Sequence, residues 1–221
     1  MHRFDVTGSG VASGTLPSLR ALSARPREPA DAAPEACGAE RDLDLLALID
    51  RGDTHAALQG LMQRHGGAVY RYCRLALGDP ALAEDIHQQV FIEAFRDLPG
   101  FGRRSTLRTW LFGIARHRVL DAAKRRRRSR ADLDAEAGVS LPDPRPPAGD
   151  RLDDAQLQAT LASCLTELEE PGRTAVLLRY QQGLTYEEMA EICGEKPGTL
   201  QARVTRAVRK LRDLLADPRT T

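Results

Sequence analysis

The segment Leu184–Leu215 constrains this chain most, because its pattern fits two short helices joined by a tight turn. Thr185, followed three residues later by Glu188, forms a capping box that marks the start of the first helix. Gly194 gives the turn a residue without a β-carbon, and Pro197 fits the first turn of the second helix. We therefore expect a helix-turn-helix unit.

The second helix of this unit is apolar on one side and basic on the other. Its apolar positions follow at spacings of four, four, three and four: Leu200, Val204, Val208, Leu211 and Leu215. The intervening basic residues are Lys196, Arg203, Arg206, Arg209, Lys210 and Arg212, and no acidic residue occurs from Lys196 to Arg212. Such a helix suits a polyanion and predicts DNA binding, the alternative being an ordinary solvated basic face.

Charge is strongly segregated along the chain, although the formal net charge is only +1. Six of the seven residues Lys124–Arg130 are basic, and the next stretch, Ala131–Ala155, holds seven acidic residues. This asymmetry, which the summed charge conceals, is the charge feature that points to nucleic acid.

The composition divides the chain into two helical domains and three other segments. Residues 1–40 are rich in Gly, Ala, Ser and Pro and are expected to be a disordered extension. Helical periodicity over 41–128 and 152–216, without strand signals, predicts an all-α fold of two small domains. The Pro-rich acidic stretch 129–151 is expected to be a flexible linker, and 217–221 a tail.

Two local features of the first domain concern its helix ends. The pair Gly66-Gly67 falls within the helix that Asp53 is expected to cap and predicts an interruption or bend there. Ser105 is expected to cap the helix that leads into the basic block.

The sequence lacks the residue patterns that several classes of function require. The four cysteines show no CxxC spacing, and no metal-ligand set, nucleophile–base pair or phosphate-cradling glycine loop occurs. We therefore expect no catalytic residue, no metal and no cofactor, and reduced buried thiols. The apolar runs are too short to span a bilayer, and the N-terminus lacks the basic-then-apolar pattern of a secretory signal peptide. We therefore expect a cytoplasmic protein without membrane insertion.

A second constellation lies in the first domain. The loop Phe101–Thr106 places an aromatic residue, Gly102 and two arginines just before a helix with Trp110 and a basic face. Aromatic faces with basic flanks suit unstacked single-stranded bases. At helical spacing with its apolar neighbours, Trp110 also fits a core position.

These residues carry a family resemblance. The sequence AEDIHQQVFIEAFRDLPGF, followed by STLRTWLFGIARHRVLDAAKRRRR, resembles the second conserved region of a bacterial sigma factor of the extracytoplasmic-function group. The sequence LTELEEPGRTAVLLRYQQGLTYEEMAEICGEKPGTLQARVTRAVRKLRDLL resembles the fourth. Both occur in the family's order, over roughly residues 42–130 and 152–215. The resemblance implies a non-enzymatic subunit that binds core RNA polymerase and directs promoter-specific initiation.

The resemblance also implies which residues act. The helix matching Ala83–Phe95 docks in the family on the beta-prime clamp, and the resemblance implies the beta flap as a further contact on the polymerase. The matching clamp-binding positions are Asp85, Gln88, Gln89 and Phe91, and the alternative for Phe91 is intradomain core. The family usually has an acid where Gln89 stands.

The helix following Ser105 matches the element that reads and melts the minus-ten promoter segment, and the loop before it matches the pocket for a flipped base. The residues implied are Phe101, Arg103, Arg104, Ser105, Trp110, Arg116, His117, Asp121, Lys124 and Arg125. Here the loop reads FGRRST, whereas the family more often has an Arg-Gly order followed by an acid.

The basic helix near the C-terminus would enter the major groove at the minus-thirty-five element. The residues implied are Lys196, Gly198, Thr199, Leu200, Gln201, Arg203 and Arg206, with core as the alternative for Leu200. The expected partners are thus core polymerase, duplex and single-stranded promoter DNA, and an anti-sigma factor of the kind that controls this group in stress responses. The competing hypothesis is a stand-alone helix-turn-helix regulator of duplex DNA.

Overall fold

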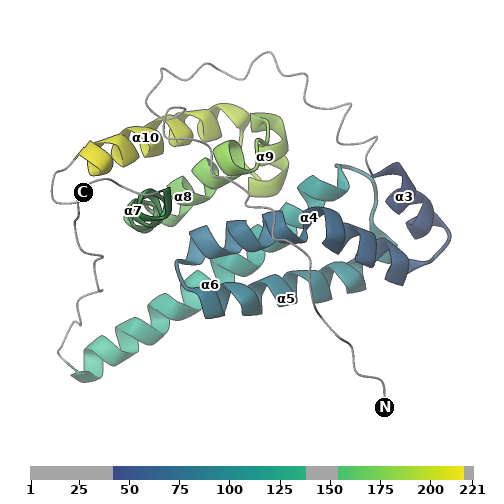
Figure 1. Ribbon diagram of the computed structural model, residues 1–221, viewed down its shortest axis with the longest axis horizontal. Coiled ribbons are helices and arrows are strands. Elements are labelled where there is room, and N and C mark those ends of the chain that lie inside the picture. Colours follow the sequence, from purple (N-terminus) through teal and green to yellow (C-terminus); the bar gives the residue numbers. More distant parts are fainter. Residues whose placement is uncertain (1–41, 138–153, 217–221) are drawn as a thin grey trace.

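The computed structural model describes residues 42–137 and 154–216, which form helices and turns with no strand in either range (Figure 1). The elements are α3 (Leu43–Asp50), α4 (Thr54–Leu77), α5 (Pro80–Asp97), the short 3-10 helix η1 (Leu98–Gly100), α6 (Leu107–Ala137), α7 (Asp154–Thr166), α8 (Glu170–Val176), the π-helical turn η2 (Leu177–Gln181), α9 (Tyr186–Cys193) and α10 (Pro197–Ala216). The all-α expectation is therefore confirmed. The expected extension 1–40 and tail 217–221 lie outside the described residues.

The first unit, α3–α6, is a helical bundle whose helix ends follow local chemistry. The Asp53 carboxylate accepts a 3.1 Å hydrogen bond from the Ala56 amide and so caps α4. Gly78, at φ 69°, ends α4 in the left-handed conformation, and Asp79 then caps α5. The cap at Asp53 agrees with the sequence expectation.

Two local expectations for this unit are wrong. Helix α4 runs unbroken through Gly66-Gly67. A β-carbon at Gly66 would lie 3.9 Å from the His87 ring, an ordinary contact distance, so the packing of α5 does not require a glycine there. Helix α6 is capped by Thr106, whose hydroxyl accepts from the Thr109 amide at 3.0 Å, and not by Ser105.

Helix α6 also extends further than the domain boundary at residue 128 predicts. It continues to Ala137, through the first nine residues of the expected linker 129–151, and it projects beyond the bundle (Figure 1). The rest of that linker, 138–151, lies outside the described residues.

The second unit, α7–α10, packs against the first (Figure 1). Its core includes the fully buried side chains of Leu178, Leu184, Met189 and Leu200. Helix α9 lies on α6, while α7, α8 and η2 contact α4. No helix in the described ranges has the length and apolar character needed to cross a membrane.

Candidate nucleic-acid interface

The helix-turn-helix forms as its sequence predicts. The Thr185 hydroxyl accepts from the Glu188 amide at 3.1 Å, and the Glu188 carboxylate accepts from the Thr185 amide at 2.7 Å. Gly194 ends α9 at φ 69°, and α10 begins at Pro197. The reciprocal cap therefore fixes where α9 begins, and the left-handed glycine ends it before α10.

Helix α10 buries one face and exposes the other. Leu200 is 0% exposed, which favours its alternative interpretation as core and removes its side chain from the DNA-facing set. Val204, Ala207 and Leu211 continue the buried stripe. The predicted minus-thirty-five residues that remain exposed are Lys196, Gly198, Thr199, Gln201 and Arg206.

Arg203 is already bound within the protein. Its Nη1 and Nη2 donate to the two carboxylate oxygens of Glu195 at 2.6 and 2.5 Å. The hydrogen bonds from Arg203 lower the pKa of Glu195, and those with Glu195 raise the pKa of Arg203. This bidentate pair ties the turn before α10 to its second turn and fixes the direction of the guanidinium.

On α6, an aromatic pair lies beside the start of the helix. The rings of Phe101 and Trp110 are 5.4 Å apart, centroid to centroid, with an interplanar angle of 57°. Both side chains are partly exposed and also pack against the core. They therefore combine the core position that helical spacing favours with accessible ring surface.

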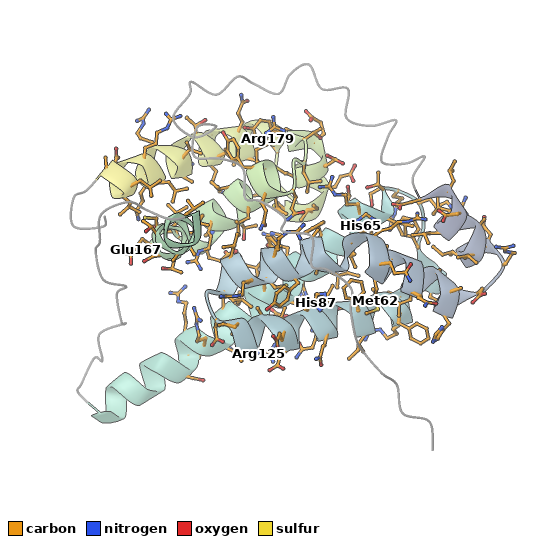
Figure 2. The ribbon with its side chains drawn as sticks, viewed as in Figure 1. Met62, His65, His87, Arg125, Glu167 and Arg179 are labelled. Carbon is orange, nitrogen blue, oxygen red and sulfur yellow. The ribbon has the colours of Figure 1, made fainter. Side chains whose placement is uncertain are left out.

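The other residues of the predicted minus-ten set on α6 range from exposed to partly buried. His117 is 65% exposed, with Nδ1 3.6 Å from a carboxylate oxygen of Asp121 one turn later. Lys124 and Arg125 are exposed, and Figure 2 shows Arg125 where α6 leaves the bundle. Arg116 differs, because it is partly buried and its Nε is enclosed without a hydrogen-bond partner.

The loop before α6 has an unusual backbone. Arg103 adopts φ 54°, in the left-handed region that favours glycine, and its Nη2 donates to Oδ1 of Asp50 at the end of α3. Arg104 is exposed, and Ser105 is half-buried with its hydroxyl donating to the Thr106 carbonyl at 3.4 Å. The sequence placed both arginines in this loop but did not reveal the link to Asp50.

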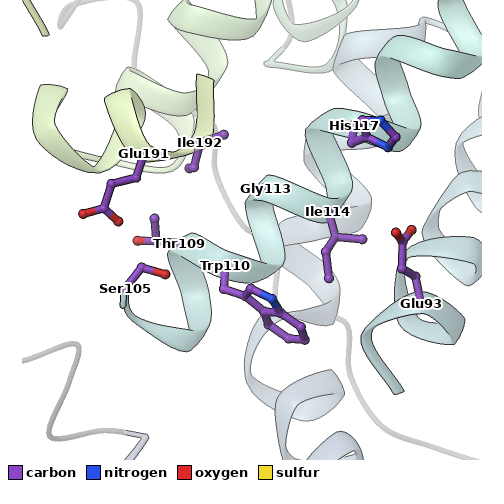
Figure 3. Close-up of a pocket in the computed structure, with 9 residues that line it drawn as sticks. All are labelled: Glu93, Ser105, Thr109, Trp110, Gly113, Ile114, His117, Glu191 and Ile192. Carbon is purple, nitrogen blue, oxygen red and sulfur yellow. The ribbon is translucent and has the colours of Figure 1, made fainter. Parts of the chain in front are cut away.

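Helix α9 covers part of the same face of α6. A pocket of about 360 Å³ runs along α6, and its lining includes Thr109, Trp110 and His117 of α6, Glu191 and Ile192 of α9, and Glu93 of α5 (Figure 3). Beside it, the Arg108 guanidinium donates to the Gln182 carbonyl, and burial lowers the Arg108 pKa. This contact between the two units was not predicted from the sequence.

Helix α5 carries the third candidate surface. Asp85, Gln88 and Gln89 are exposed, as a binding surface requires, but Phe91 is 4% exposed and packs edge-on against His87 at 5.0 Å. Phe91 therefore belongs to the core. Its burial excludes it as a surface anchor in this arrangement.

Two residues that the sequence reasoning missed supply apolar surface there. Ile92 is 69% exposed and Phe95 is 44% exposed. The signal was available, because Ile92 follows Gln89 by three positions and Gln88 by four, which places all three on one helical face.

Both units match models of known protein regions. The model of sigma-70 region 2 matches residues 61–129, and that of sigma-70 region 4 matches residues 158–211. The ECF RNA polymerase sigma factor SigE of Mycolicibacterium smegmatis is 33% identical over 173 residues, 77% of this chain and 67% of the relative. The RNA polymerase sigma-H factor of Pseudomonas aeruginosa is 32% identical over 179 residues, 76% of this chain and 90% of the relative.

Solved structures match as well. The sigma factor RpoE from Bartonella quintana, in complex with the anti-sigma factor NepR, aligns with a TM-score of 0.58 at 28% identity, over 72% of this chain and 97% of that one. CnrH, in complex with the cytosolic domain of CnrY, aligns with a TM-score of 0.59 at 26% identity, over 80% of this chain and 98% of that one.

Proposed function

The chain belongs to the extracytoplasmic-function sigma factors of the sigma-70 family, and we propose which of its surfaces perform the steps of promoter-specific initiation. A protein of this family is a non-enzymatic subunit that binds core RNA polymerase and promoter DNA and directs where transcription starts. The observation that carries this function is the match of two regions, 2 and 4, in order along one chain. A stand-alone helix-turn-helix regulator would need region 4 alone.

The exposed face of α5 is the proposed contact with the beta-prime clamp of the polymerase. Asp85, Gln88 and Gln89 supply a polar rim, and Ile92 supplies the apolar centre in place of the buried Phe91. Interfaces of this kind draw most of their binding energy from a few buried anchors within a polar surround. The second unit, α7–α10, is the proposed contact for the beta flap.

The loop 101–106 and helix α6 are the proposed minus-ten site. Phe101 and Trp110 offer ring faces to unstacked bases, while Lys124 and Arg125 offer charge to phosphates. Because α9 packs on α6 and Thr109 is buried beside it, the full face is proposed to open to DNA when the two units separate. His117 and Asp121 remain exposed or partly exposed on the same helix and are proposed to reach bases.

The exposed N-terminal half of α10 is the proposed minus-thirty-five site, in the major groove. Lys196, Thr199 and Gln201 lie where a recognition helix meets DNA. Arg206 is exposed for base edges or phosphates, and Arg203 is oriented by Glu195.

Run-off transcription tests the proposed function. The purified full chain is added to core RNA polymerase on a library of genomic promoters, and start sites are mapped. We expect transcripts that depend on the chain and share two upstream elements. A chain that binds duplex DNA tightly and specifically without polymerase, and yields no transcript, would support the stand-alone regulator instead.

We also propose a cytoplasmic location and control by an anti-sigma factor. RpoE of Bartonella quintana is solved with such an inhibitor, and CnrH with a cytosolic domain of its partner. Affinity purification of the tagged chain from cells, with and without stress, is expected to recover an inhibitor in one condition and core polymerase in the other. Recovery of polymerase alone in every condition would count against the inhibitor, and recovery of the chain with membranes lacking any partner would count against the location.

A further inference from the structure

Arg103 combines a strained backbone with a side chain that already holds an anion. Among the described residues other than glycine, it is the one with a positive φ, 54°. An L-residue pays a steric penalty there because its β-carbon approaches the following carbonyl. Strained residues persist where the surrounding structure holds them, and they cluster at binding sites.

The anion is the carboxylate of Asp50, the last residue of α3. Nη2 of Arg103 contacts Oδ1 of Asp50, and the two side chains are 48% and 61% exposed. An ion pair this open to water is weak and is readily exchanged for another anion. A guanidinium matches the geometry of a phosphate at least as well as that of a carboxylate.

The neighbours of Arg103 indicate which anion would replace Asp50. Phe101 precedes Arg103 by two residues and its ring packs 5.4 Å from that of Trp110, and the exposed Arg104 follows Arg103 directly. Aromatic rings stack on unpaired bases, and each such base is flanked by phosphodiesters. An arginine in the same loop is therefore suitably placed for the backbone of that strand.

We propose that Arg103 binds a phosphate of the unpaired promoter strand and that Asp50 is its internal counter-ion in the DNA-free protein. This inference rests on the proposed function, because it assigns a ligand group within the minus-ten site. On binding, the guanidinium leaves Asp50 for the phosphate, and the freed carboxylate is solvated. Asp50 thus lowers the affinity for single-stranded DNA by competing for Arg103.

The test uses holoenzyme assembled from the full chain and core polymerase. The probe is a fluorescein-labelled single-stranded oligonucleotide that carries the minus-ten segment of a promoter mapped by run-off transcription. Arg103→Gly removes the guanidinium and suits the φ of 54° without strain. We expect about three- to tenfold weaker binding, and a slope of log affinity against log salt that is shallower by about 0.7, the value for one phosphate on a single strand.

A double-mutant cycle tests the role of Asp50. Asp50→Asn is expected to tighten binding about two- to threefold in the wild-type background and to have no effect in the Arg103→Gly background. Glu187→Gln, which removes one exposed negative charge from α9 in the other unit, is the matched control and should give the same small change in both backgrounds.

Three results would overturn the inference: unchanged binding by Arg103→Gly, weaker binding by Asp50→Asn, or equal tightening by Asp50→Asn with and without Arg103. Each of these presupposes that the wild-type holoenzyme gives promoter-dependent transcripts and binds the probe. Failure at that earlier step would instead reject the proposed function.

Discussion

The guanidinium of Arg173 in α8 donates a 2.6 Å hydrogen bond from Nη1 to the carbonyl oxygen of Ala76 near the end of α4. Its Nη2 donates to the carbonyls of Thr166 and Leu168 at 3.0 and 2.9 Å. One side chain therefore satisfies backbone carbonyls of both units at once. Burial, followed by the charge of Arg126, lowers the Arg173 pKa.

Arg173→Ala is expected to loosen the contact between the two units. The change removes three hydrogen bonds and leaves half-buried carbonyls unpaired, so the unfolding free energy should fall by about 1–3 kcal/mol. Urea denaturation measures the stability, and small-angle X-ray scattering should give a larger radius of gyration. Arg209→Ala, at an exposed position of α10, is the control. An unchanged radius and stability would show that the side chain does not hold the units together.

Phe91 and its neighbour Ile92 should separate stability from polymerase binding. Phe91→Ala empties a core site and should lower the unfolding free energy by about 3–5 kcal/mol. Ile92→Ala changes an exposed position, so stability should stay within about 0.5 kcal/mol, while affinity for core polymerase falls about tenfold. Chemical denaturation and competition with a labelled sigma factor give the two readouts. If the Ile92→Ala variant binds core polymerase with normal affinity, Ile92 is not the apolar anchor of this contact.

The capping box makes a local prediction. Thr185→Ala should cost about 1 kcal/mol of stability, because the amide of Glu188 at the start of α9 loses its acceptor. Thr205→Ala is the matched control: its hydroxyl donates to the Gln201 carbonyl within α10, and the change should stay within about 0.5 kcal/mol. Thermal unfolding measures both, and equal losses would contradict the capping role.

His87 predicts a dependence of stability on pH. Its Nε2 lies 3.1 Å from the Gly66 carbonyl, and burial lowers its pKa below the ordinary value of 6.5. The folded chain therefore binds fewer protons at His87 than the unfolded chain does. The stability that neutral His87 contributes is complete above pH 6.5 and is lost as the pH falls below it. Unfolding free energies measured from pH 5 to 8 should show a shallower decline for His87→Gln. The exposed His55→Gln should keep the wild-type slope, and a shared slope in all three proteins would refute the assignment.

Local signals in the sequence predicted the helix ends well. The capping box at Thr185, the glycine turn at Gly194 and the cap at Asp53 all occur as expected. Each of these features depends on a few consecutive residues and on hydrogen bonds within them. Such features can be predicted without knowledge of the rest of the fold.

Features that depend on distant residues were predicted less well. Gly66 does not interrupt α4, which continues through the glycine pair to Leu77. Phe91 and Leu200 are core, whereas Ile92 is exposed, because neighbouring positions on a helix face different sides. The continuation of α6 to Ala137 and the capping of α6 by Thr106 also differ from the expectation.

The sequence by itself determined the all-α class, the two regions in order and the family to which the chain belongs, because periodicity, caps and motifs are written in consecutive residues. Only the tertiary structure decided that α9 lies over α6, that Arg173 joins α8 to α4, and that Asp50 holds Arg103. The physical reason is separation along the chain: Arg103 lies 53 residues after Asp50, and no local pattern specifies which carboxylate a guanidinium will meet.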